Sequence, residues 1–106
     1  MNLLCWYENK PLPEAVEAEK RLYPEGIHGA LAQLFRQEPD CCVRTAVMQD
    51  PDFGLSDELL NWADVVVYFS HKHWREIPDE RVDALQRRVL EGMGLVLLHS
   101  SHASKI

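Results

Sequence analysis

The sequence predicts an α/β domain built on an open, mostly parallel sheet. Short apolar stretches that resemble buried strands alternate along the chain with stretches of helical periodicity. Such alternation favours parallel strands that are joined by right-handed crossovers. A length of 106 residues is enough for one small domain and too short for two. We therefore expect a single sheet with helices on its faces.

Four apolar stretches favour strands, at residues 3–7, 42–48, 65–69 and 95–98. The third, Val-Val-Val-Tyr-Phe, is the clearest, and its apolar run is unbroken rather than alternating. An unbroken run indicates a strand that is covered on both faces. A turn is expected at residues 49–52, which read Gln-Asp-Pro-Asp.

The segments between these strands have helical features. Residues 14–22 have room for one or two helical turns, and residues 26–37 carry apolar positions on one face, between Pro24 and Pro39. Ser56 is placed to cap a short helix over Leu59 and Leu60. The last helix begins at Pro78 and ends at Gly92, and its expected buried stripe is Val82, Leu85, Val89 and Leu90.

Composition and charge limit the classes of function. Hydrophobic residues make up 46% of the chain and charged residues 26%, as in globular proteins. The net charge of −6 argues against binding to nucleic acid or to anionic membranes. No apolar run approaches the roughly 20 residues of a membrane span, and the first residues lack the basic region of a signal peptide. We expect a cytoplasmic protein.

The three cysteines do not suggest a disulfide framework or a cysteine-based zinc site. Cys41 and Cys42 are adjacent, and the sequence contains no Cys-x-x-Cys pair. We expect small buried thiols near strands.

Ligands of open α/β sheets bind beyond the carboxyl ends of the strands, so the residues after each strand are the first candidates for a site. Glu8 and Asn9 follow the first strand, and Gln49 and Asp50 follow the second. All five histidines map to this edge of the sheet, at positions 28, 71, 73, 99 and 102. Imidazoles near carboxylates indicate a metal site or an acid–base site.

Other roles for these residues stay open. His28 also suits a packing role at a helix start, and His73 and His99 suit solvated loops. Ser100 or Ser101 follows a strand where α/β enzymes place a nucleophile, but Gly-x-Ser-x-Gly is absent, and we favour capping or ligand binding. No cysteine occupies this turn, which excludes a cysteine-dependent amide hydrolase.

Four stretches carry a resemblance to a known family. They are Tyr-Pro-Glu-Gly-Ile-His at 23–28, Asp-Val-Val-Val at 64–67 followed by His71, Arg-Arg-Val-Leu-Glu-Gly-Met-Gly-Leu at 87–95, and His-Ser-Ser-His-Ala-Ser-Lys-Ile at 99–106. Together, and in this order, they resemble the trehalose-utilisation protein ThuA family. The resemblance covers nearly the whole chain.

The resemblance implies a flavodoxin-like, three-layer α/β/α sandwich of the class I glutamine amidotransferase-like superfamily, without the amidotransferase cysteine. It implies trehalose or related disaccharide metabolism, with an oxidised keto-sugar as one proposed substrate. Matching the motifs selects Glu8, His28, His71, Ser100 and His102 as polar positions of the family. We expect catalytic roles for His71, Ser100 and His102, and substrate-binding roles for Glu8 and His28, together with Trp74 and His99 from their places after the strands. Trp74 would stack on a sugar ring or pack internally. A divalent metal such as zinc would bind at His28, His71 and His102.

The chain also departs from the family pattern. Tyr7 stands where Trp-Asn-Glu has its asparagine, Trp74 replaces the second histidine of His-x-x-His, Ser101 replaces a glycine and Ala103 an aromatic residue. Family members are considerably longer, and residues 1–106 resemble one partial, N-terminal domain that ends after the fourth strand. The alternative function is therefore a non-catalytic, truncated or split domain that acts as a binding module. Its unfinished sheet would pair with a second copy or with a companion chain.

Overall fold

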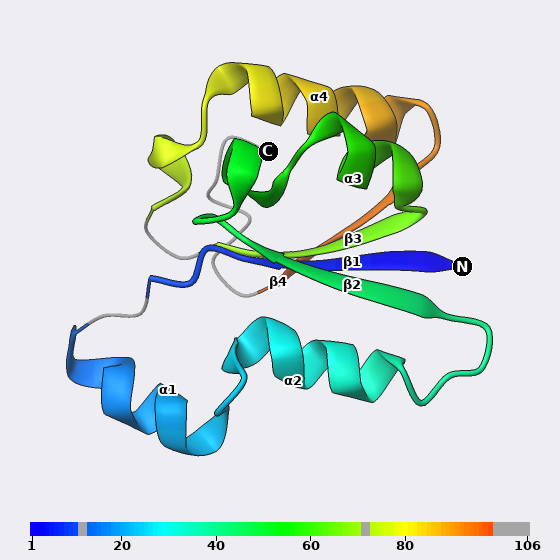
Figure 1. The fold of residues 1–106 in the computed structure, drawn as a ribbon. Helices are drawn as coiled ribbons and strands as arrows, with labels where there is room; N and C mark the ends of the chain where they lie inside the picture. Colours follow the sequence, from blue (N-terminus) through cyan, green and yellow to red (C-terminus); the bar gives the residue numbers. More distant parts are fainter. Residues whose placement is uncertain (11–12, 71–72, 99–106) are drawn as a thin grey trace.

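The computed structural model describes residues 1–10, 13–70 and 73–98, and it contains a central sheet of four parallel strands (Figure 1). The strands are β1 (Asn2–Tyr7), β2 (Cys42–Val47), β3 (Val65–Phe69) and β4 (Gly94–Leu98). Their order across the sheet is β2-β1-β3-β4. The chain therefore leaves β1 in one direction to reach β2 and continues in the other direction to reach β3 and β4. This arrangement confirms the predicted parallel α/β fold and is consistent with a flavodoxin-like open sheet.

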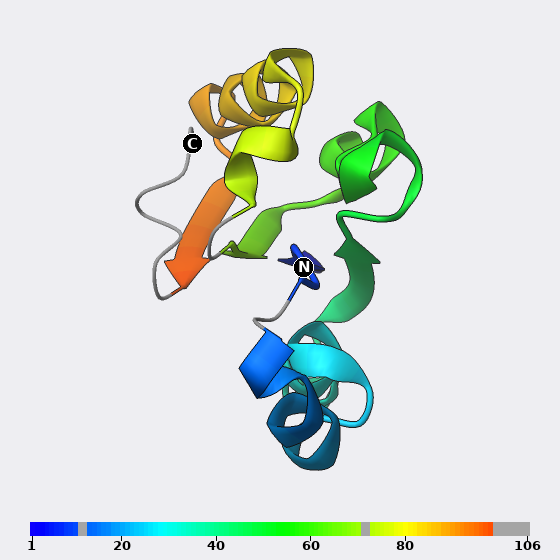
Figure 2. The ribbon, with the colours of Figure 1, turned by 90° about the vertical axis from the view of Figure 1, so that its left-hand side faces the viewer.

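Helices cover both faces of the sheet, which gives three layers (Figures 1 and 2). A 3₁₀ turn (Pro13–Ala15), α1 (Val16–Leu22) and α2 (Gly26–Phe35) lie on one side. The other side carries α3 (Asp57–Trp62) and α4 (Asp79–Leu90). No helix in the described ranges has both the length and the apolar character that a membrane span requires.

The core consists of two hydrophobic clusters, one on each face of the sheet. Successive side chains of a strand point to opposite faces. Leu4 and Trp6 therefore join the larger cluster under α3 and α4, whereas Leu3 and Cys5 join the smaller one. The Trp6 ring stacks on Tyr68 of β3, with centroids 4.5 Å apart. The central residues of β3 are buried, as its unbroken apolar run predicts.

Element boundaries agree with the sequence at several points. The Ser56 hydroxyl accepts a hydrogen bond from the Leu59 N–H at 3.2 Å, so the predicted N-cap of α3 is confirmed. Gly92 has a φ of +113° directly after α4, a conformation that favours glycine. The turn expected at residues 49–52 is longer than predicted, because it continues as a 3₁₀ segment, Pro51–Gly54. The Trp6 indole N–H donates to the Phe53 carbonyl in this segment at 2.8 Å.

Two expectations about burial are wrong. Leu90 does not belong to the buried stripe of α4, since its side chain is 89% exposed. Successive helical residues are turned by about 100°, so Leu90 points well away from the direction in which Val89 packs. Cys42 is exposed rather than buried, because β2 is an edge strand and most of its residues lie near the surface. All three cysteines are free thiols.

Candidate functional site

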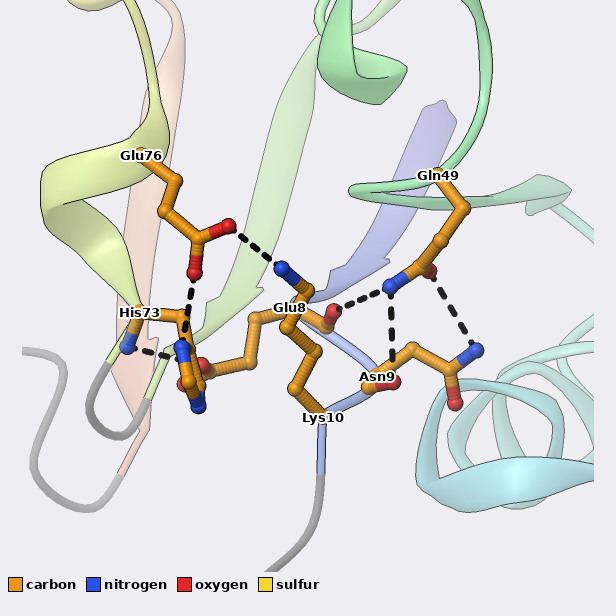
Figure 3. Close-up of polar contacts among 6 residues, drawn as sticks. All are labelled: Glu8, Asn9, Lys10, Gln49, His73 and Glu76. Atoms are coloured by element: carbon orange, nitrogen blue, oxygen red, sulfur yellow. Dashed lines mark hydrogen bonds and ion pairs between the residues drawn. The ribbon is translucent and has the colours of Figure 1, made fainter.

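Polar side chains from three strand ends meet at the carboxyl edge of the sheet (Figure 3). Glu8, Asn9 and Lys10 follow β1, Gln49 follows β2, and His73 to Glu76 follow β3. The strands are parallel and adjacent, so their carboxyl ends lie together. The chain direction across the sheet also reverses here, between β1 and β3, which is where ligands of such folds bind.

Glu8 is a buried carboxylate at the centre of this edge. Its side chain is only 1% exposed, and the backbone N–H of His73 donates to Oε2 at 2.9 Å. Its own N–H donates to the Phe69 carbonyl at 3.1 Å, which holds the residue against β3. A buried carboxylate is costly unless hydrogen bonds compensate for lost water. The Glu8 side chain therefore depends on hydrogen bonds such as that from His73 to occupy this position.

His73 and Glu76 form a pair that the sequence pattern does not predict. Nδ1 of His73 lies 2.7 Å from Oε2 of Glu76, and Lys10 contacts the other oxygen of the same carboxylate (Figure 3). The hydrogen bond from Lys10, assisted by that from His73, lowers the pKa of Glu76 and keeps it ionised. In a neutral His73 ring that donates from Nδ1 to this carboxylate, Nε2 is the acceptor.

The pair has a local cause, and the spacing of His73 and Glu76 is the one signal of it in the sequence. Glu76 is the third residue after His73, and Trp74–Glu76 forms a 3₁₀ turn. In 3₁₀ geometry, side chains at i and i+3 lie above one another. The sequence alone does not show that residues 74–76 form this turn, so it leaves open whether His73 pairs with Glu76 or is simply solvated.

Gln49 ties the end of β2 to the end of β1. Its amide nitrogen lies 3.3 Å from the Glu8 carbonyl and 3.5 Å from the Asn9 carbonyl. In return, the Asn9 amide donates to the Gln49 side-chain oxygen at 3.3 Å. Asn9 has a positive φ of 56°, a conformation in which asparagine is enriched. These contacts fix the direction in which the chain leaves β1.

His28 lies on the other side of the sheet, close to the start of α2. Its ring centroid is 5.8 Å from that of Tyr7, and its Nδ1 is a buried atom without a hydrogen-bond partner in the described part of the chain. Burial lowers the pKa of His28, against the opposing effects of Asp50 and Glu19, so the neutral ring is favoured. The Tyr7 hydroxyl donates to the Glu19 carboxylate, at 3.0 Å from Oε1.

The strand alternation separates these groups. Tyr7 and Glu8 are successive residues, so their side chains leave β1 towards opposite faces. The His28 ring lies near the Tyr7 ring, whereas the backbone N–H of His73 donates to the Glu8 side chain. The two described histidines, His28 and His73, therefore lie near the carboxyl end of β1 but on its two sides. The other three lie outside the described residues.

Several predicted site residues lie outside the described residues, namely His71, His99, Ser100 and His102. The side chain of Trp74 is also outside them, although its backbone begins the turn Trp74–Glu76. Of the three candidate metal ligands, the structure describes only His28. Within the described ranges, no group of three or more His, Cys, Asp or Glu side chains could hold a metal ion.

Comparison with known proteins gives no match, either to a protein family or to a curated protein.

Proposed function

We propose that this chain is a carbohydrate-handling protein, similar to the ThuA family, that acts on a disaccharide or a keto-sugar. The observation that carries the proposal is the buried Glu8 carboxylate beside the His73–Glu76 pair. A sugar offers many hydroxyl groups, and each can donate to a carboxylate or to a free ring nitrogen. The exposed Glu76 carboxylate and the His73 ring would provide both kinds of acceptor, and the buried Glu8 holds the His73 backbone beside them.

The chemistry that this pair supports is proton transfer. Nε2 of His73 would accept a proton from a sugar hydroxyl, or from a carbon beside a keto group. The Glu76 carboxylate would then stabilise the imidazolium, and the proton would return to the product. His71, Ser100 and His102 remain in the proposal as catalytic residues, with His28, His99 and Trp74 as substrate-binding residues. A divalent metal at His28, His71 and His102 remains a second route to activation.

Turnover assays test the proposal directly. Purified protein is incubated with trehalose and with its keto derivative, the sugars are followed by NMR, and bound metal is measured in parallel. We expect His73→Gln to lower the rate by about 100-fold or more, the size of typical general acid–base contributions. Glu8→Gln should lower the rate less, because Glu8 acts through the His73 backbone that it holds. Glu58→Gln is the control, since Glu58 is an exposed carboxylate in the first turn of α3. Absence of turnover with both sugars would contradict an enzymatic role.

A second candidate function is a non-catalytic binding module, and a specific observation favours it. The strand β4 lies at an edge of the described sheet, and Val96 and Leu97 in it are 45% and 38% exposed. Apolar side chains on an edge strand are typical of surfaces that pair with another chain. The partner would be a second copy or a companion chain. Sedimentation that shows only monomer over a wide concentration range would contradict the second-copy form.

We also propose a cytoplasmic location. Cys5, Cys41 and Cys42 are all free thiols, a state that reducing compartments maintain. Reaction of all three thiols with a maleimide after unfolding, in protein purified without reductant, would agree with this location.

A further inference from the structure

Two hollows adjoin the turn that connects α1 to α2. The first has a volume of about 350 Å³ and the second of about 220 Å³. The first is lined by Asn9, Val16, Glu19, Lys20, Tyr23, Pro24 and Gly26. The residues that also line the second are Tyr23, Pro24 and Gly26, so this turn forms a wall common to both hollows.

The linings combine polar groups with an exposed aromatic ring. Asn9, Glu19 and Lys20 offer donors and acceptors in the first hollow, and Glu25 and Gln33 do so in the second. Small-molecule sites typically place a few polar groups around apolar and aromatic surface. A sugar ring matches this lining, because its hydroxyls need donors and acceptors and its C–H face packs on an aromatic ring. The first hollow is at the small end of the roughly 300–1,000 Å³ range of ligand sites.

Hydrogen bonds fix the turn that forms the wall. The Tyr23 N–H donates to the Glu19 carbonyl at 2.7 Å, and the Gly26 N–H donates to the Tyr23 carbonyl at 2.8 Å. Gly26 has a φ of +83°, and a Cβ at this position would overlap Cε1 of His28. The wall is therefore set before any ligand arrives, which lowers the entropic cost of binding.

Neighbouring side chains orient the two carboxylates of the hollows. The Tyr7 hydroxyl donates to Glu19, and the Gln33 amide donates to Glu25 at 2.7 Å. Each carboxylate oxygen has two lone pairs, so acceptor capacity remains for a ligand hydroxyl. Asn9, the second residue after Tyr7, lines the first hollow, so this hollow reaches the end of β1 on the face where Tyr7 contacts Glu19.

We infer that the two hollows are adjoining subsites for the two rings of a disaccharide, separated by Tyr23 and Pro24. The inference rests on the proposed function, since it says where the two rings of that carbohydrate bind. The ring in the first hollow lies towards Asn9 and the strand ends. The ring in the second hollow lies over the start of α2.

Titration of ¹⁵N-labelled protein with trehalose and with glucose tests the inference by NMR. We expect trehalose to shift the amide signals of both hollows, including Gly26 and Gln33, and to bind about tenfold more tightly than glucose. Tyr23→Ala should weaken trehalose binding by up to about tenfold, as expected for an aromatic contact, while Tyr23→Phe retains the binding. Leu34→Ala is the control, since Leu34 is an exposed residue of α2 that lines neither hollow.

The Gln33→Ala variant separates the two subsites and does not alter the Tyr23 turn. It should weaken the binding of trehalose and leave the binding of glucose in the first hollow unchanged. Equal affinities for the two sugars would overturn the two-ring assignment. Shifts confined to His73, Glu76 and Gln49 would overturn the subsites but leave the proposed function standing. If neither sugar shifts any signal and neither is turned over, both the inference and the proposed function are wrong.

Discussion

Single residues at the end of β1 decide what this edge of the sheet can do. Tyr7 points towards α1 and α2, where its hydroxyl contacts Glu19. The next residue, Glu8, is buried and accepts a hydrogen bond from the His73 backbone. One strand end thus supplies an oriented ionisable group to each face of the sheet.

Gly26 is the residue whose substitution should disturb the candidate sugar site most. Gly26→Ala would meet both an unfavourable positive φ and the overlap with His28, whereas Gly92→Ala would meet only the first, because its Cβ site is open. Strained φ values cost about 1–3 kcal/mol each. Chemical denaturation should therefore show Gly26→Ala to be the more destabilised variant, by at least about 1 kcal/mol. Equal losses in the two variants would mean that the His28 ring moves aside without cost.

Cys5 should be the least reactive thiol of the chain. Burial raises the pKa of Cys5 to about 11, and the nearby Arg36 only partly opposes this effect. At pH 8 roughly a thousandth of the folded protein would carry a Cys5 thiolate, which is the reactive form. Mass spectrometry after iodoacetamide treatment should find Cys42 modified first, since its side chain is exposed. Cys5 should react only after the chain unfolds, and early modification of Cys5 would contradict its burial.

At the scale of elements, the sequence predicts what local patterns determine. Its apolar runs locate all four strands, and Ser56 marks the start of α3. It does not predict the 3₁₀ segment Pro51–Gly54, whose carbonyl group at Phe53 accepts from the distant Trp6 indole. The exposure of Leu90 is also missed, because it depends on which part of the sheet lies below the end of α4. These features depend on contacts between segments that are far apart in sequence.

The candidate site is predicted only in part for the same reason. The rule that ligands bind at strand ends selects Glu8 correctly as a residue of the carboxyl edge. The role of Lys10 is not visible in the sequence, since its contact with Glu76 joins residues 66 positions apart. The turn between α1 and α2 belongs to the motif Tyr-Pro-Glu-Gly-Ile-His at 23–28, yet its two hollows need the packing of one helix against the next.

Arg88 joins α4 to α3 and should matter more to stability than its neighbour Arg87. Its Nε donates to the Leu60 carbonyl at 2.8 Å, and its Nη2 donates to the Ala63 carbonyl at 3.1 Å. These bonds satisfy carbonyls at the end of a short helix that would otherwise need other partners. Thermal and chemical unfolding should show that Arg88→Met costs about 1–3 kcal/mol. Arg87→Met is the matched control, and a similar loss there would assign the effect to helix charge alone.

At the scale of the whole molecule, the two edges of the sheet differ in chemistry. At the β2 edge, the Arg44 guanidinium lies 4.4 Å above the Trp62 ring, and Thr45 is exposed. A charged side chain of this kind discourages pairing with another strand. At the β4 edge, the strand Gly94–Leu98 contains only glycine and aliphatic residues. Pairing through the sheet is therefore expected at one edge and not at the other.

This difference predicts self-association through β4. Val96 pairs in register with Val67 of the smaller core cluster, and its exposed side chain extends that apolar face to the edge of the sheet. The net charge of −6 opposes contact between copies, so added salt should strengthen association by screening this repulsion. In sedimentation velocity experiments, Val96→Lys should shift the protein towards monomer, because pairing would bury an unpaired charge. The same change at the opposite edge, Thr45→Lys, should leave the distribution unchanged. If both variants associate as the natural sequence does, the contact between copies lies elsewhere.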